Sequence, residues 1–259
     1  MKKAVKHIYM GLLLVFLYAP ILVMIVLSFN SGKSRGNISG FSFRWYIELF
    51  QNEQILQALY NTVIIAVLAA LLATVIGTLA SVGIYALKRK PQALVLNITY
   101  LPIVNPDIVT GISLMILYLF MQLELGFFTM LLSHIAFNIP YVIFSVLPRL
   151  RQMDGNLYEA ALDLGASPLY ALRKVILPEI MPGVITGALM AFTMSIDDFI
   201  ISYFTSSGVQ NLSIYVYSSA KRGIEPTVYA LSTLMFVTVL TLLLILNRRS
   251  AHERSAVKV

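Results

Sequence analysis

Apolar residues in this chain form long, uninterrupted blocks separated by short polar segments. A helix needs about 20 apolar residues to cross the roughly 30 Å hydrocarbon core of a bilayer, and only helices and closed barrels satisfy their backbone hydrogen bonds there. Because the blocks are continuous and not alternating, they predict membrane-spanning helices and not barrel strands. Six blocks are long enough, at approximately Ile8–Phe29, Thr62–Leu87, Ile98–Met121, Phe127–Leu147, Val184–Phe204 and Val228–Leu246.

Composition agrees with an all-α membrane protein, which we treat as a single transmembrane domain over residues 1–259. Of the residues, 58% are hydrophobic and only 12% are charged, whereas a typical soluble domain has about 25% charged residues. The absence of cysteine excludes disulfides, thiolate metal sites and a thiol nucleophile. The basic start, Met1–His7, resembles that of a signal peptide, but the apolar block behind it exceeds the roughly 7–15 residues of a cleaved segment. No clear small-x-small cleavage site follows, so we expect an uncleaved first span.

The Lys and Arg residues lie at the ends of the apolar blocks, which favours a role in membrane orientation over nucleic-acid binding. With the N-terminus inside, 14 of the 19 basic residues fall in inner segments and 5 in outer ones. The inner set is Lys2, Lys3, Lys6, Lys88, Arg89, Lys90, Arg149, Arg151, Arg173, Lys174, Arg248, Arg249, Arg254 and Lys258. The outer set is Lys33, Arg35, Arg44, Lys221 and Arg222. Cytoplasmic loops carry the excess of positive charge, so both termini are expected in the cytoplasm.

Small residues recur every four positions in two of the predicted spans. They are Ala69, Ala73, Gly77 and Ser81 in the second span, and Gly183, Gly187, Ala191 and Ser195 in the fifth. Such stripes let helix backbones approach one another closely. They predict contact within one bundle or, as the alternative, contact with a second membrane subunit.

The inner loop between the fourth and fifth spans predicts a helical hairpin. Four residues at helical spacing predict a short amphipathic helix, namely Leu157, Ala160, Ala161 and Leu164. Gly165 is well placed to end this helix. Ser167 is expected to cap a second helix that has Pro168 at its first position and ends before Pro178.

The residues of this loop resemble the EAA loop of the permease subunits of ABC importers. The family pattern is Glu-Ala-Ala, three residues, Gly, nine residues, then Ile-x-Leu-Pro, and this chain has Glu159-Ala160-Ala161, Gly165 and Val175-Ile176-Leu177-Pro178. The one departure is Val175 in place of isoleucine. The resemblance implies a type I ABC importer permease fold (MetI-like), with residues 62–247 as the core permease domain and 154–178 as the cytoplasmic coupling loop.

In that family the short helix docks into a groove on a cytoplasmic ATPase. The resemblance therefore implies that Glu159, Ala160, Ala161 and Gly165 couple this chain to an ATPase. The sequence has no Walker-type Gly-x-x-x-x-Gly-Lys-Ser/Thr, so ATP and magnesium are expected on the partner subunit, with no enzymatic activity, cofactor or metal in this chain. The alternative is an ordinary amphipathic hairpin at the membrane interface.

Three carboxylates fall within the predicted spans, at Asp107, Asp197 and Asp198. A charge at the centre of a bilayer costs about 2.5–3.5 kcal/mol on insertion scales and is usually functional. Ser195 and Asp198 lie about 60° apart on one helix face, the face of the small residues. No Lys or Arg falls inside the six spans, so a cationic solute passing these residues is expected to supply the missing partner. The alternative is that Asp197 and Asp198 cap a broken helix and that Asp107 caps the turn after Pro106.

Two other polar or aromatic groups stand out. Trp45 sits with aromatic neighbours before Glu48 and Glu53, and is either an interfacial anchor or part of an aromatic face that receives a cation. His134 and Asn138 lie four residues apart on one face of the fourth span. Two ligands are too few for a metal, so we expect hydrogen bonds between helices.

The resemblance narrows to the spermidine/putrescine permeases of the PotC type. It rests on the six-span layout and on Tyr18-Ala19-Pro20, Phe43-Arg44-Trp45-Tyr46 and Ser195-Ile196-Asp197-Asp198-Phe199. This likeness implies a polyamine pathway that includes Trp45, Asp107, Ser195, Asp197 and Asp198. The alternatives are relatives for 2-aminoethylphosphonate, ferric iron or an oxyanion.

The resemblance also implies partners and a location. The partners are a homologous permease subunit (PotB-like), a cytoplasmic ATPase dimer (PotA-like), an external solute-binding protein (PotD-like) and membrane lipid. The location is the bacterial inner membrane. A secondary transporter or channel subunit is the alternative of another class. It is opposed by the absence of an evident inverted pair of interrupted helices, and it leaves the EAA loop without a purpose.

Overall fold

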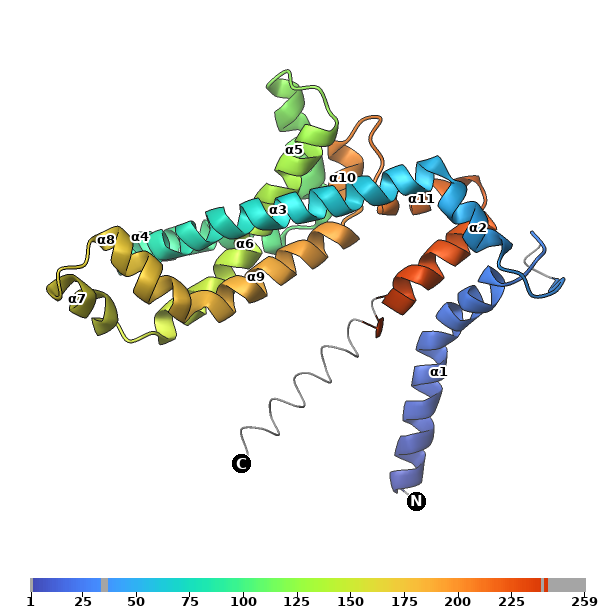
Figure 1. Ribbon diagram of the computed structural model, residues 1–259, viewed down its shortest axis with the longest axis horizontal. Coiled ribbons are helices and arrows are strands. Elements are labelled where there is room, and N and C mark those ends of the chain that lie inside the picture. The colour runs from blue at the N-terminus through green and yellow to red at the C-terminus, as the bar shows by residue number, and fades with distance from the viewer. Residues whose placement is uncertain (1, 34–36, 239, 242–259) are drawn as a thin grey trace. The chain divides into compact units, whose positions relative to one another are not determined.

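The computed structural model describes residues 2–33, 37–238 and 240–241 of the 259-residue chain. Within these ranges the regular structure is helical, and β-structure is limited to an isolated bridge between Asn30 and Phe41. The chain divides into two compact units (Figure 1). One comprises Gln57–Tyr215, and the other comprises Met1–Leu56 with Val216–Val259. The single transmembrane domain expected from the sequence stays a prediction.

The unit formed by the two ends of the chain holds α1 (Lys2–Ser28), α2 (Arg44–Gln51), the start of α3 (Glu53–Ala86), most of α11 (Leu212–Arg222) and a short apolar helix at Pro226–Thr238. Helix α1 begins with basic residues and continues as a long apolar stretch, and its segment Val5–Ser28 is long and apolar enough to cross a membrane. This agrees with the first predicted span.

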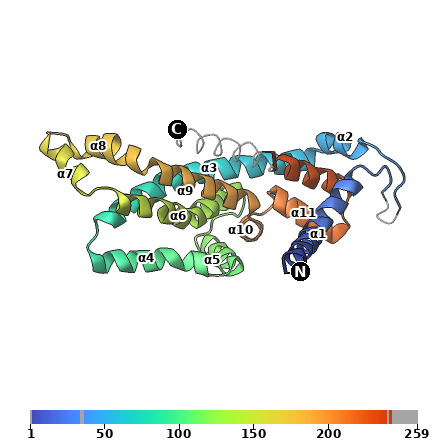
Figure 2. The ribbon, with the colours of Figure 1, turned by 90° about the horizontal axis from the view of Figure 1, so that it is seen from below.

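The Gln57–Tyr215 unit contains the candidate site. Its helices are most of α3, α4 (Arg89–Val104), α5 (Asp107–Phe120), α6 (Phe127–Gln152), α7 (Asn156–Asp163), α8 (Pro168–Ala171), the π-helical turn η1 (Leu172–Ile176), α9 (Leu177–Asp197) and α10 (Ile200–Thr205). Helices α3, α6 and α9 lie side by side in both views (Figures 1 and 2). Their shared core is built from aliphatic residues, among them Ala73, Val142, Val146, Leu150 and Ile180.

Glycines allow α3 and α9 to approach α6 closely. A Cβ atom added at Gly77 of α3 would lie 2.7 Å from Val142 Cβ, and one added at Gly183 of α9 would lie 2.9 Å from the Ser145 carbonyl oxygen. Gly187 also lies close to α6, since a Cβ atom added there would lie 3.1 Å from Val142 Cα. The prediction that the small residues make contacts within one bundle is confirmed at these positions.

Replacing Gly183 with leucine is expected to destabilise this packing by about 1–3 kcal/mol, because the backbone of α6 would have to move. The matched control is Gly83→Leu, since Gly83 lies on an exposed face of α3 with open space around its Cα. The measurement is the midpoint of thermal unfolding of the detergent-solubilised protein. Equal midpoints for the two variants would contradict the packing that the glycines permit.

The third predicted span is wrong as a single helix. Helix α4 ends at Val104, α5 begins at Asp107, and the two axes meet at an angle of 106°. Asn105 and Pro106 have extended backbone between the helices, with ψ angles of 143° and 135°. The cause is Pro106, because proline lacks an N–H and disfavours helical backbone at the preceding residue.

The fifth predicted span is wrong at both ends. The segment Pro168–Asp197 forms one long apolar helical stretch of 30 residues, so the second hairpin helix does not end before Pro178. A proline at 178 would clash with the carbonyl of Lys174 in a regular α-helix, and the wider π turn η1 covers Lys174. The stretch then stops at Asp197, and α10 begins at Ile200.

Four helices in the described part of the chain are long and apolar enough to cross a membrane, or five if α4 and α5 count as one broken span. The sixth predicted block, Val228–Leu246, includes the helix Pro226–Thr238, and residues 239 and 242–246 of that block lie outside the described residues. The side chains of Lys2, Lys3, Arg35, Arg248, Arg249, Arg254 and Lys258, which entered the charge count, also lie outside them.

Candidate functional site

The predicted hairpin forms, and local backbone chemistry ends its first helix. After α7, Gly165 has a φ of +84°, a left-handed conformation that glycine adopts without strain. The Gly165 N–H donates to the Leu162 carbonyl at 2.9 Å, and the Ala166 N–H donates to the Ala161 carbonyl at 3.0 Å. This pair of bonds is a Schellman motif, so Gly165 is confirmed as the stop of the helix.

The second helix of the hairpin begins as the sequence predicts. Ser167 has extended backbone, and its side-chain oxygen accepts a hydrogen bond from the Tyr170 N–H at 3.3 Å. Pro168 occupies the first turn, where its missing N–H costs nothing. The cap fixes the sharp turn between α7 and α8.

The tip of the hairpin presents apolar and small residues outward. Leu164 is 89% exposed and Leu169 is 64% exposed, while Ala160 and Gly165 are also exposed. Glu159 is exposed and makes no hydrogen bond or ion pair within the described residues. A surface of this kind, with exposed leucines beside an unpaired carboxylate, is suited to docking against a protein partner with a basic group.

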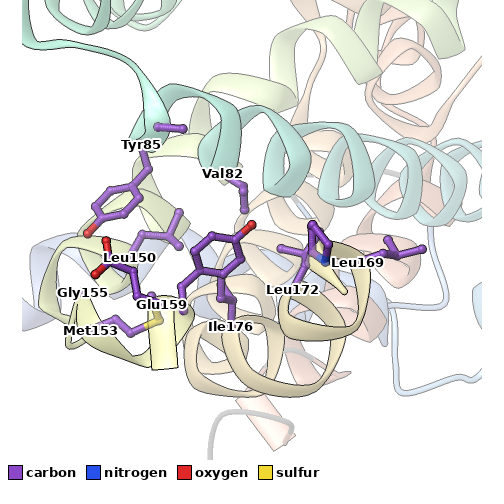
Figure 3. Close-up of a pocket in the computed structure, with 12 residues that line it drawn as sticks. Val82, Tyr85, Leu150, Met153, Gly155, Glu159, Leu169, Leu172 and Ile176 are labelled. Carbon is purple, nitrogen blue, oxygen red and sulfur yellow. The ribbon is translucent and has the colours of Figure 1, made fainter. Parts of the chain in front are cut away.

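A pocket of about 590 Å³ separates the hairpin from the ends of α3 and α6 (Figure 3). Tyr85 projects from α3 toward the hairpin, Leu150 and Met153 come from the end of α6, and Glu159 lies on the α7 side. The hairpin is joined to the bundle through the continuous stretch α8–η1–α9 and through Tyr158 of α7, which packs against the bundle core. A helix of that length spans about 45 Å, and it connects the hairpin tip to Asp197.

Asp198 lies at the break after α9 and caps α10. Its carboxylate accepts hydrogen bonds from the Ile201 N–H (3.2 Å), the Ser202 N–H (2.7 Å) and the Ser202 hydroxyl (2.8 Å). The side chain is only 7% exposed. The alternative stated for Asp198 in the sequence, a cap on a broken helix, is confirmed, and its contact with substrate stays a prediction.

Asp197 is in the opposite situation. It is the last residue of α9, is exposed, and has no hydrogen-bond or ion-pair partner in the part of the chain that the structure describes. The last carbonyls of a helix are unsatisfied and carry roughly half a negative charge. A carboxylate at that position is unfavourable alone and favourable once a cation arrives.

Asp107 is the first residue of α5, where the helix dipole stabilises a negative charge. It is exposed and lies close enough to Tyr141 of α6 to interact with it electrostatically. No side chain forms a capping hydrogen bond at the start of α5, so no hydrogen bond supports the predicted capping role of Asp107.

His134 confirms the prediction of hydrogen bonds between helices. Its Nδ1 lies 2.6 Å from Ser195 Oγ and its Nε2 lies 2.8 Å from Ser202 Oγ. The predicted pathway residue Ser195 is therefore buried and bonded to α6. The same prediction is wrong for Asn138, which is fully buried and whose amide has no hydrogen-bond partner among the described residues.

Two members of this network escaped the sequence analysis. They are Ser202 and Asn211, whose amide nitrogen lies 2.8 Å from Ser202 Oγ. Asn211 also caps α11, since it accepts a hydrogen bond from the Ile214 N–H at 2.9 Å. An asparagine directly before the first residue of a helix is a capping signal, and Asn211 has this position before α11. Nothing in the sequence around Ser202 signals its role. Within the described ranges no cluster of three or more metal-ligating side chains occurs.

Trp45 is a packing residue in this conformation. It is 1% exposed, its indole N–H donates to the Asn30 carbonyl at 2.5 Å, and the Arg44 guanidinium carbon lies 5.0 Å from its ring centroid. The ring is therefore closed to a solute, and the contact with substrate expected from the sequence stays a prediction.

A bundle of long apolar helices with a projecting helical hairpin defines a membrane transport subunit of the permease class. The chain belongs to the family described as binding-protein-dependent transport system inner membrane component, whose model matches residues 73–253.

Relatives and solved structures agree with this family. The chain is 36% identical over 251 residues to the spermidine/putrescine transport system permease protein PotC of Haemophilus influenzae, a match that covers 95% of this chain and 98% of the relative. It is 38% identical to the putrescine transport system permease protein PotI of Escherichia coli K12, over 86% of this chain and 83% of the relative. The fold is similar to that in the crystal structure of a bacterial ABC transporter involved in alginate import, with a TM-score of 0.70, 18% identity, and coverage of 96% and 94%. The predicted MetI-like permease fold is confirmed, and the relatives are named as transport permeases and not as enzymes.

Proposed function

We propose that this chain forms half of the transmembrane pathway of an ATP-driven importer for polyamines such as spermidine and putrescine. The observation that carries the proposal is the unpaired carboxylate of Asp197 at the negative end of α9. Polyamines are linear polycations, and ammonium groups are the partners that this carboxylate and the carbonyls beside it lack. The names of the relatives supply the substrate class.

The coupling mechanism follows from the continuity of one helix. The hairpin tip and Asp197 lie at opposite ends of the stretch Pro168–Asp197. A partner ATPase that binds Glu159, Ala160, Ala161 and Gly165 and closes on ATP would push on one end, and the helix would carry the movement to the acids at the other. ATP and magnesium reside on that ATPase, and this chain makes or breaks no bonds.

The assembly we propose has three partner types besides lipid. A homologous PotB-like permease supplies the other half of the pathway, a PotA-like ATPase dimer binds the hairpins, and an external PotD-like protein delivers the solute. The excess of Lys and Arg in the inner loops supports cytoplasmic termini in a bacterial inner membrane. Asp197 and Asp107 are the proposed first contacts for the solute, whereas Ser195, Asp198 and Trp45 are expected to hold the path in shape.

A secondary transporter remains the second candidate, and one observation favours it. Two helices are interrupted, between α4 and α5 and between α9 and α10, and paired broken helices are typical of ion-coupled transporters. The exposed hairpin argues against this candidate because an ion-coupled transporter has no ATPase to dock.

Uptake by the reconstituted transporter is expected to be selective for polyamines. Labelled spermidine uptake should be competed by excess putrescine and not by sulfate or 2-aminoethylphosphonate, because only the diamine presents two ammonium groups without a compensating anion. The measurement is the initial rate in proteoliposomes at fixed spermidine and rising competitor. Competition by sulfate or the phosphonate, with none by putrescine, would contradict the substrate class.

A further inference from the structure

We propose that His134 is a positioning residue of the transport pathway, whose imidazole ties together the two helices on either side of the α9–α10 break and so fixes where the Asp197 carboxylate lies. This inference rests on the proposed function for its link to transport. Its structural basis is independent of the substrate.

The imidazole bridges the break. Helix α6 is continuous over its 26 residues and contacts both α9 and α10. From α6, His134 bonds to Ser195 of α9, two residues before Asp197, and to Ser202 of α10, four residues after Asp198. The side chain is 2% exposed, so both bonds are shielded from water. Helix α6 therefore holds α9 and α10, the helices on either side of the break, in a fixed relative position.

The hydrogen positions of the network follow from its members. Ser202 Oγ has one proton and two lone pairs. It lies 2.8 Å from the Asp198 carboxylate, which can only accept, and 2.8 Å from the amide nitrogen of Asn211, which can only donate. The remaining lone pair must accept the bond from His134 Nε2, so Nε2 carries a proton. Nδ1 is then free to accept from the Ser195 hydroxyl, and a neutral imidazole satisfies every group.

The network needs a donor and an acceptor on one rigid side chain. Lysine or arginine at 134 would lack the acceptor and would add a buried charge, and leucine would lack both. The α4–α5 break provides a contrast, because no side chain caps the start of α5, and Asn105, Val109 and Thr110 donate their backbone N–H groups to backbone carbonyls. Side-chain hydrogen bonds therefore hold the α9–α10 break, beside Asp197, in place, in contrast to the α4–α5 break.

Loss of the imidazole should therefore let the Asp197 carboxylate occupy a wider range of positions, while the charge of the site stays the same. We expect His134→Leu to raise the KM for spermidine about tenfold, the effect of losing two hydrogen bonds of ordinary strength, with Vmax and ATPase activity changed less than about twofold. His134→Gln should recover most of the affinity, because its amide also offers a donor and an acceptor. An effect on Vmax alone, or equal KM values for wild type and His134→Leu, would overturn the proposal.

A distance measurement tests directly whether His134 fixes the relative position of α9 and α10. The natural chain has no cysteine, so spin labels can be placed at Thr193→Cys on α9 and Ser207→Cys just after α10, both exposed positions. In the assembled transporter the wild-type background should give a narrow distance distribution, His134→Leu a broad one, and His134→Gln a narrow one. If His134→Leu fails to assemble, Ser202→Ala, which removes the α10 end of the bridge, should also broaden the distribution.

The outcomes separate the two proposals. A narrow distance distribution in both His134→Leu and Ser202→Ala would overturn the positioning role of His134 even if spermidine is transported. Broad distributions in both variants, beside a narrow wild-type distribution, in a transporter that carries no polyamine would support the positioning role of His134 and contradict the proposed function.

Discussion

Replacing Gly165 with valine is expected to abolish transport while the chain still inserts into the membrane. Its φ of +84° places it in the left-handed region, where a β-branched residue is strongly strained. Left-handed backbone costs other L-residues about 1–2 kcal/mol, and valine more. The hairpin would relieve the strain by changing the angle between α7 and α8, which displaces Glu159 and the exposed leucines from the ATPase. The measurement is uptake together with co-purification of the ATPase.

Two variants control for effects other than the turn. Gly165→Asn should retain much of the activity, because asparagine tolerates left-handed backbone better than other residues. Gly155→Ala should behave like wild type, since Gly155 has helical backbone and open space around its Cα. Unchanged uptake in Gly165→Val would remove the coupling role of the hairpin.

The variant Asp197→Asn is expected to raise the KM for spermidine by about 30-fold or more. Asp197 is exposed without substrate, and we expect its carboxylate to lose water when it binds an ammonium group in the closed pathway. Removing one partner of such a desolvated charge pair typically costs about 2–5 kcal/mol, and 2 kcal/mol is roughly a 30-fold change in affinity. The chain should fold and assemble normally, because the carboxylate makes no hydrogen bond or ion pair within the described residues. The measurement is the concentration dependence of initial uptake rates in proteoliposomes.

Comparison with neighbouring acids isolates the effect. Asp197→Glu keeps the charge and should lose less than Asp197→Asn. Asp107→Asn should have a smaller effect, because the dipole of α5 already stabilises that charge. Asp198→Asn should lower stability as well as uptake, because the carboxylate of Asp198 holds the start of α10. A KM in Asp197→Asn equal to that of wild type would contradict its role as a cation ligand.

The hairpin was predictable because its signals are local. A glycine at the required left-handed position, a serine cap and a proline in the first turn each act on backbone within a few residues. Tertiary packing did not have to be known. The same local logic fails at Pro178, where the π turn η1 accommodates a proline that was expected to end the helix.

The breaks in the third and fifth spans were harder to predict, because hydrophobicity measures the transfer of side chains and is insensitive to backbone direction. The apolar block from Ile98 to Met121 continues through Pro106 although the helix turns by 106°. At Asp198 the break is held by Ser202, Asn211 and His134 from other elements, and one sequence gives no view of such contacts. Capping was therefore one of two open alternatives for Asp198; the geometry confirms the cap, and contact with substrate stays a prediction.

The most direct test of the central claim is spermidine uptake into proteoliposomes that contain this chain, its partner permease, the ATPase and the solute-binding protein. We predict that uptake requires ATP and the binding protein, persists when ion gradients are collapsed with ionophores, and is lost in Gly165→Val. Uptake that proceeds without ATP and stops when the ion gradient is collapsed would contradict an ABC permease and would favour an ion-coupled transporter.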